Sequence, residues 1–192
     1  MSPSTVYYAA MTLDGFIADE SHGIEWLMGH DGSYSGEGAV PQEGTYDEFF
    51  ETVGALVMGS ATYDFLVGYT ASGKPWPYPG TPTWVLSSRD LPPIDGEEAD
   101  IRFARGDVAE LAPEWIEAAG DSKLWVVGGG NVASQFVDAG LLDEVIVTVV
   151  PVVLGRGKPL FDEGLPGGPM QLTAARAFDS GMVELSYELQ TP

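Results

Sequence analysis

Several segments of this 192-residue chain place hydrogen-bond donors directly after a short apolar run, an arrangement suited to binding phosphate. The run that ends at Val127 leads into three consecutive glycines and then into a short helical pattern. Backbone amides that open a helix have no partner inside it, and the helix dipole makes them attract an anion. We therefore predict a phosphate- or pyrophosphate-binding turn formed by Gly128, Gly129, Gly130, Asn131 and Val132.

Two further segments repeat this pattern with hydroxyl groups. They are Gly59, Ser60 and Thr62 after one apolar run, and Ser87, Ser88 and Arg89 after another. Hydroxyls at a helix start and a guanidinium beside two serines are good phosphate donors. Three such segments in one domain predict an extended ligand with several phosphates.

The three glycines also fit two other patterns. A tight strand-to-helix turn that needs positive φ would explain them without a ligand. Gly128, Gly130 and Ala133 also fit the G-x-G-x-x-A dinucleotide fingerprint, which expects an acidic residue about 20 positions further on. Because that region reads "VTVV" followed by Pro151, the Rossmann interpretation is rejected.

The elements that must position these segments alternate between strand and helix. The pattern predicts strands at 5–10, 55–59, 81–88, 100–105, 123–129 and 143–151, helices at 43–54, 60–68, 107–120 and 131–140, and a hairpin at 171–189. Ser60 is expected to cap its helix, and Pro113 either kinks the third helix or starts a second one. The order predicts a single α/β domain over residues 1–192, with a mostly parallel sheet, helices on both faces and an antiparallel edge. Ligands of such sheets bind beyond the carboxyl ends of the strands.

Composition excludes several classes of function. A formal net charge of -21 argues against nucleic acid and anionic membrane surfaces as partners. The sequence shows no signal-peptide pattern, no apolar run long enough to span a bilayer and no cysteine, so we expect a cytoplasmic protein. His22 and His30 are expected to be loop residues, so no metal site is predicted.

Five blocks of the sequence, taken in order, resemble a known family. They are "MTLDGFIA", "LVMGSATY", "WVLSSRD", "LWVVGGGNVASQFVDAGLLDEVIVTVVPVVLGRGKPLF" and the final hairpin. Together they resemble the dihydrofolate-reductase-like superfamily, in the branch of the riboflavin-biosynthesis reductase C-terminal domain and its stand-alone relatives. The resemblance implies a three-layer α/β/α fold with a mixed eight-stranded sheet, an NADPH-dependent reductase and a homodimer.

The resemblance also implies roles for individual residues. Gly59, Ser60 and Thr62 would meet the cofactor phosphates. Ser87, Ser88 and Arg89 would surround the adenosine 2′-phosphate. The three glycines with Asn131 and Val132 would hold the pyrophosphate and the nicotinamide side. Ala9, Ala10 and the "MTLDG" loop would wall the nicotinamide pocket. The family often has a basic residue after Gly59, where this chain has Ser60 and Ala61, so NADH stays open beside NADPH.

The chemistry expected from the resemblance is hydride transfer to a C=N or C=O bond of a small pyrimidine- or pterin-like heterocycle. A proton must also be delivered, and the candidates are Asp14 and Asp47, the latter on the predicted helix at 43–54. The alternative is a module of the same fold that binds a nucleotide or flavin-like ligand without turnover. A carboxylate facing the nicotinamide pocket would distinguish the two.

Overall fold

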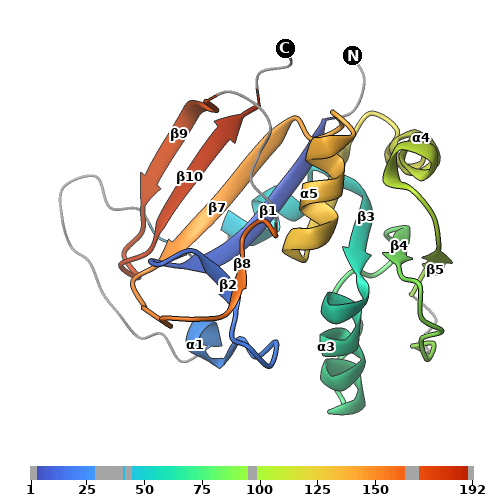
Figure 1. Ribbon diagram of the computed structural model, residues 1–192, viewed down its shortest axis with the longest axis horizontal. Coiled ribbons are helices and arrows are strands. Elements are labelled where there is room, and N and C mark those ends of the chain that lie inside the picture. Colours follow the sequence, from blue (N-terminus) through green and yellow to red (C-terminus); the bar gives the residue numbers. More distant parts are fainter. Residues whose placement is uncertain (1–3, 29–40, 42–44, 95–98, 163–168, 190–192) are drawn as a thin grey trace.

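An eight-stranded mixed sheet forms the centre of the protein (Figure 1). The computed structural model describes residues 4–28, 41, 45–94, 99–162 and 169–189. The sheet has the strand order β5-β4-β3-β6-β1-β7-β10-β9. Its strands are β1 (Thr5–Thr12), β3 (Val53–Gly59), β4 (Thr83–Leu86), β5 (Ile101–Ala104), β6 (Lys123–Gly128), β7 (Glu144–Val150), β9 (Gln171–Ala177) and β10 (Val183–Glu188). β10 runs antiparallel to both of its neighbours, β7 and β9, whereas all other neighbouring pairs are parallel, so the parallel strands end at one common edge.

Helices cover both faces of this sheet. Helices α4 (Val108–Ala119) and α5 (Gly130–Asp138) pack on one face, and α2 (Thr45–Phe50) and α3 (Ser60–Ala71) pack on the other. A short helix, α1 (Glu25–Met28), and a two-stranded sheet of β2 (Phe16–Ala18) and β8 (Lys158–Pro159) lie near the carboxyl edge. Both chain ends lie on the opposite side of the molecule from α1 and α3 (Figure 1).

Strand β3 shows why the sheet needs two helical layers. Its residues 55–58 are fully buried. Ala55 and Val57 join the cluster under α4 and α5, whereas Leu56 and Met58 join the cluster under α3. A strand that is apolar on both sides is typical of a parallel sheet covered on both faces.

Helix α4 is held by a stripe of buried side chains and by its cap. Its buried residues are Val108, Ala112, Trp115 and Ala119, a spacing that places them on one helical face. Asp107 is the N-cap, and its side chain accepts a hydrogen bond of 2.7 Å from the Ala109 amide. Pro113 lies inside a single continuous helix, which resolves the two alternatives for this segment.

The predicted fold class is confirmed, with three local differences. The short β2–β8 pair and α1 were not expected, because pieces of two to four residues carry no periodicity. The N-cap of α3 is Gly59, without a side-chain cap, and Ser60 is the first helical residue, so the prediction that Ser60 caps this helix was wrong.

Gly130 is required by packing rather than by its backbone conformation. A Cβ atom at this position would lie 2.7 Å from the carbonyl oxygen of Pro159 and 2.9 Å from that of Leu160. Neither contact can be relieved by turning a side chain. Gly130 therefore lets α5 begin directly against the β8 segment.

We predict that Gly130→Ala destabilises the protein by about 1–3 kcal/mol, because the added methyl group overpacks against backbone. Gly68→Ala, in the exposed part of α3 where a Cβ would contact nothing within 4 Å, is the matched control. It should stabilise the protein by roughly 0.5–1 kcal/mol through helix propensity. Urea unfolding of both variants measures the difference. Equal effects would show that Gly130 is not a packing position.

Candidate active site

A cavity of about 890 Å³ runs along the carboxyl edge of the sheet. The segments that line it follow the sheet order. They are Ser87 and Ser88 after β4, Gly59 to Thr62 after β3, Gly128 to Val132 after β6, Ala9 and Ala10 in β1, and Thr148 in β7. The sheet therefore brings together segments that lie up to about 140 positions apart in the chain, as expected for parallel strands that end at one edge.

Two helices begin at this cavity with their first amides unsatisfied. The N-cap residues are Gly59 for α3 and Gly129 for α5, and neither makes a side-chain cap hydrogen bond. By contrast, α4 is capped by Asp107, and neither this cap nor Val108, the first helical residue, is part of the described cavity wall. Since a glycine cap leaves amides and the positive end of the dipole open, these two helix starts can hold an anionic group.

At each of the three glycines of the β6–α5 turn, the absence of a side chain has a different physical reason. Gly128 has φ +142°, a conformation that side chains disfavour. Gly130 packs against the carbonyl groups of Pro159 and Leu160. Gly129 has neither a positive φ nor a close backbone contact, and a Cβ there would meet only Ile17 Cδ1, at 3.9 Å. Gly129 is thus the position where a missing side chain leaves the cavity open.

The Ser-Ser-Arg segment divides between two environments. Ser87 and Ser88 line the cavity, as predicted. Arg89 does not, because its Nη2 atom lies 2.6 Å from Asp64 Oδ2 outside the cavity. Arg105 lines this end instead. Arg89 borders a smaller hollow beside the cavity, together with Ser87 and Arg105. The role of Arg89 at a 2′-phosphate therefore stays a prediction, and Arg105 is a second candidate, whose one sequence signal was its place at the end of a predicted strand.

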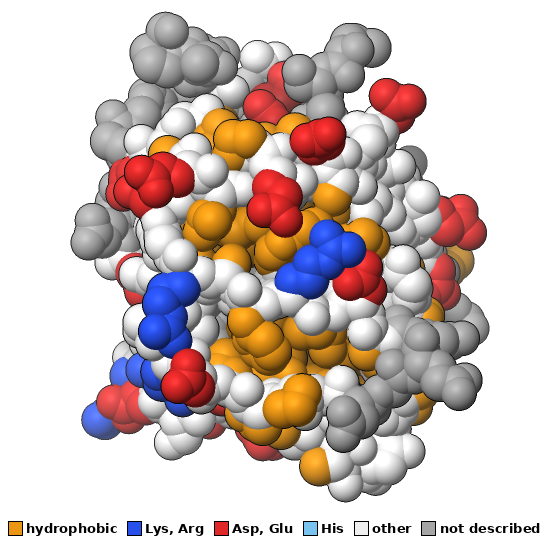
Figure 2. Space-filling model, turned by 90° about the vertical axis from the view of Figure 1, so that its right-hand side faces the viewer, with side chains coloured by type: hydrophobic (Ala, Val, Ile, Leu, Met, Phe, Trp, Pro, Cys, Tyr) orange, Lys and Arg blue, Asp and Glu red, His pale blue; other side chains and the backbone are white. Residues whose placement is uncertain are grey.

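The described wall of the cavity is less acidic than the rest of the chain. It carries two of the eight Lys and Arg residues, Arg105 and Lys158, against one carboxylate, Asp162. Figure 2 shows acidic side chains scattered over the face that carries the β5 edge, with few basic ones between them. In a protein of net charge -21, this local balance is what an anionic ligand needs.

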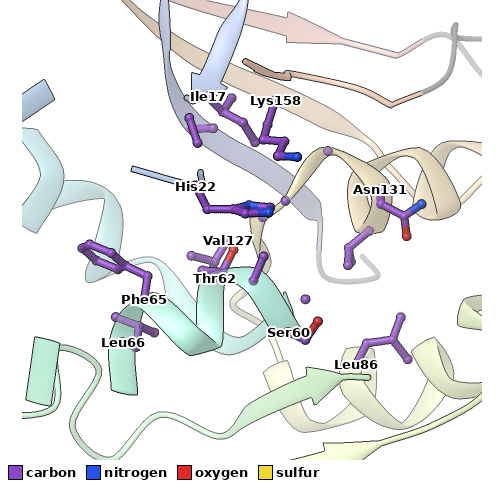
Figure 3. Close-up of a pocket in the computed structure, with 18 of the residues that line it drawn as sticks. Ile17, His22, Ser60, Thr62, Phe65, Leu66, Leu86, Val127, Asn131 and Lys158 are labelled. Atoms are coloured by element: carbon purple, nitrogen blue, oxygen red, sulfur yellow. The ribbon is translucent and has the colours of Figure 1, made fainter. Parts of the chain in front are cut away.

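Residues of the β2–β8 region line the side of the cavity that faces α3 (Figure 3). Figure 3 shows Ile17 and Lys158 on one side and Ser60, Thr62 and Phe65 of α3 on the other. His22 lies between them as an exposed loop residue. No group of acidic and histidine side chains among the described residues can hold a metal ion, and His30 lies outside those residues.

The far end of the cavity is aromatic. It is lined by Tyr8, Tyr46, Tyr78 and Trp125. The Trp125 ring meets the Tyr78 ring edge-on at 5.6 Å between centroids, and its indole N–H donates to the Tyr8 carbonyl at 3.1 Å. Ala10, also part of the wall and on the same face of β1 as Tyr8, leaves room beside these rings. A flat, largely apolar group fits such a wall.

Neither predicted proton donor is part of the described cavity wall. Asp14 accepts hydrogen bonds from the Thr12 hydroxyl at 2.6 Å, from the Gly155 amide at 2.7 Å and from the Leu154 amide at 3.2 Å. The Thr12 hydroxyl, helped by the two amides, holds the pKa of Asp14 below its usual value. Asp14 is thus an acceptor that ties the β1–β2 turn to the segment after β7. Asp47 is exposed on α2.

The comparison with known proteins agrees with this fold and site. The family model described as the RibD C-terminal domain matches residues 79–183. Protein YwjB of Bacillus subtilis is 31% identical over 187 residues, which cover 97% of this chain and 98% of that protein. The chain therefore belongs to the RibD C-terminal domain family, and the predicted superfamily branch is confirmed.

Solved structures show the same architecture. A protein from Shewanella sp. PV-4 assigned to riboflavin biosynthesis superposes with a TM-score of 0.77 at 25% identity, over 98% of this chain and 99% of that one. Dihydrofolate reductase from Enterococcus faecalis, complexed with NADP(H) and RAB-propyl, superposes with a TM-score of 0.62 at 15% identity, over 100% and 99%. The fold is that of dihydrofolate reductase. No helix among the described residues is long and apolar enough to cross a membrane.

We predict that Asp14→Asn lowers the melting temperature at pH 7, because an amide oxygen replaces an ionised acceptor of several hydrogen bonds. A depressed pKa contributes stability that is present above the unfolded-state value of about 3.9 and is lost as pH falls through the folded-state value. The difference from the wild type should therefore shrink below about pH 3.9. Thermal melts between pH 3 and 7 measure it, with Asp47→Asn as the exposed control. A difference that persists unchanged at pH 3 would contradict the assignment.

Proposed function

We propose that this protein is an NADPH-dependent reductase that transfers a hydride to a C=N or C=O bond of a small pyrimidine- or pterin-like heterocycle. The observation that carries the proposal is the shape of the cavity. One continuous space joins two glycine-capped helix starts at one end to a wall of aromatic rings at the other. This layout suits a long phosphate-bearing cofactor that meets a flat substrate.

The residues that would hold the cofactor lie on adjacent strand ends. The amides at the starts of α3 and α5 would bind its phosphates, with Thr62 and Asn131 as side-chain donors. Ser87, Ser88 and Arg105 would receive the 2′-phosphate. When bound, the cofactor supplies the hydride, and the protein supplies binding, orientation and the electrostatic environment.

The substrate would lie against the aromatic end, beside Ala9 and Ala10. Trp125 and the tyrosines would exclude water and orient a flat ring. The carboxylate that lines the cavity among the described residues is Asp162, and His22 is the imidazole there. These two side chains replace Asp14 and Asp47 as the groups that can carry a proton to the reacting atom.

A second function, binding of a nucleotide or flavin-like ligand without turnover, has one observation in its favour. Neither of the carboxylates expected to deliver a proton reaches the described cavity wall. A module that only binds its ligand would need the helix starts and the aromatic wall but no positioned acid. Oxidation of NADPH in the presence of a substrate distinguishes the two functions.

We also propose that the protein is a homodimer. Strand β9 is the last strand of the sheet, six of its seven residues are exposed, and Leu172 on it is 52% exposed. An exposed edge strand with apolar side chains is the kind of surface that a second copy covers. Sedimentation velocity that shows a monomer at micromolar concentration would refute this part of the proposal.

The wild type should bind NADPH, seen as a change in nicotinamide fluorescence, and oxidise it with dihydrofolate or a pyrimidine substrate. Gly129→Val should abolish binding, because its side chain would enter the open side of the β6–α5 turn. The extended backbone at Gly129, with φ -86°, accepts valine, so the melting temperature should change little. Unchanged NADPH affinity in a folded Gly129→Val protein would mean that Gly129 has only a structural role in the turn.

Arg105 should determine the preference for NADPH over NADH. Its Nη2 atom is 3.0 Å from Asp90 Oδ1, and both side chains are mostly exposed, so this surface pair can be exchanged for a phosphate. Arg105→Ala should weaken NADPH binding about ten- to hundredfold, since a charge-assisted contact is worth about 1.5–3 kcal/mol. NADH binding should hardly change. Arg89→Ala is the control. A larger loss of NADPH affinity in that variant would mean that Arg89, and not Arg105, binds the 2′-phosphate.

A further inference from the structure

Three polar side chains form a hydrogen-bonded row at the aromatic end of the cavity. Tyr8 and Thr148 belong to the cavity wall, and Glu184 lies behind them with 9% of its surface exposed. The Tyr8 hydroxyl donates to Glu184 Oε2 at 3.0 Å. A side-chain hydrogen bond also joins Thr148 to Tyr8. The row thus leads from the ligand space to a nearly buried carboxylate.

The sheet places these residues side by side. Thr148 on β7 is the register partner of Ala10 on β1 and of Glu184 on β10. Tyr8 lies two positions before Ala10 and so projects from the same face. Its ring packs edge-on against Phe49 at 4.6 Å between centroids. The Tyr8 hydroxyl is therefore fixed between the cavity and Glu184.

The carboxylate sets the direction of every hydrogen bond in the row. An ionised carboxylate can only accept, and Arg176 Nη1 lies 3.9 Å from Glu184 Oε1 as a countercharge. Tyr8 must use its one hydrogen toward Glu184, and Thr148 uses its own toward Tyr8. Burial, together with the charge of Glu184, raises the pKa of Tyr8 to about 12, so the phenol keeps that hydrogen at neutral pH.

The Tyr8 and Thr148 hydroxyls therefore offer a ligand only the lone pairs of their oxygen atoms. Because these hydrogen bonds use both hydroxyl hydrogens, the oxygen atoms of Tyr8 and Thr148 are left to accept. A ligand that placed a carbonyl oxygen or an unprotonated ring nitrogen there would face these lone pairs. Reversing the row would instead leave the nearly buried Glu184 carboxylate without its donor, which is costly.

We propose that Tyr8 and Thr148 recognise amino or ring N–H groups of the substrate, and that Glu184 is the positioning residue that makes this wall an acceptor. The inference rests on the proposed function and narrows its substrate class. The heterocycle must present N–H donors at the edge that faces β1 and β7. A ring with only acceptors at that edge is excluded.

Two pyrimidines of similar shape test the inference. 2,4-Diaminopyrimidine offers N–H donors, whereas 2,4-dimethoxypyrimidine has none. Calorimetric titration of the protein saturated with NADP⁺ should show about three- to tenfold tighter binding of the diamino probe, the usual effect of a hydrogen bond between neutral groups. Tyr8→Phe, which keeps the ring and removes the hydroxyl, should abolish most of this preference.

Glu184→Gln gives a response that a merely structural role would not produce. The glutamine amide can donate to Tyr8, which frees the Tyr8 hydrogen to turn toward the cavity. Binding of the dimethoxy probe should therefore strengthen while binding of the diamino probe weakens. Tyr187→Phe on β10 removes a tyrosine hydroxyl outside the described cavity wall and serves as the control. Should Tyr8→Phe fail to fold, Thr148→Val should show the same loss of preference.

The outcomes separate the two proposals. Wild-type protein that binds NADPH but binds both probes equally, or neither, overturns the inference and leaves the proposed function standing. A preference that survives Tyr8→Phe also overturns it. Wild-type protein that binds neither NADPH nor NADH overturns the proposed function itself, because the cofactor titration does not involve the Tyr8 row.

Discussion

The unpaired backbone amides at the starts of α3 and α5 are the interaction around which the site is organised. Both helices follow buried parallel strands directly, and both begin with a glycine in place of a capping side chain. A serine or aspartate cap would satisfy those amides from within the protein. Leaving them open lowers the stability of each helix end, and it creates two adjacent positive ends that remain available to water or to an anionic group.

The charge of the protein makes this arrangement selective. A chain with 29 acidic and 8 basic residues repels anions over most of its surface. Around the cavity, Arg105, Lys158 and the two helix starts offset that repulsion locally. Most other cations are engaged in ion pairs at the surface, such as Arg89 with Asp64 and Arg102 with Asp100. Arg105 is itself paired with the exposed Asp90, so an anion at this end of the cavity would have to displace that carboxylate.

The two ends of the cavity depend on different parts of the chain. The phosphate end comes from the strand-to-helix turns after β3, β4 and β6, where local sequence decides the geometry. The aromatic end needs β1, β7 and the C-terminal β10 in register, because Tyr8, Thr148 and Glu184 meet only across three strands. Asp14 holds the segment that leads from β7 to Lys158. Loss of register at β10 would thus disrupt the aromatic end without changing the strand-to-helix turns.

The sequence by itself determined the fold class, the family and the strand ends that carry donors, because apolar periodicity, glycine turns and helix starts are local properties. It also identified the residues of the β6–α5 turn, but not why each position needs glycine. The close approach of Gly130 to Pro159, for example, involves a distant segment of the chain. Only the tertiary structure decided that Arg105 rather than Arg89 faces the cavity and that Asp14 is a structural acceptor. It alone also showed that Glu184 stands behind Tyr8. Each of these depends on which side of a strand or turn faces a neighbour far away in the chain, and spacing along the sequence does not encode that contact.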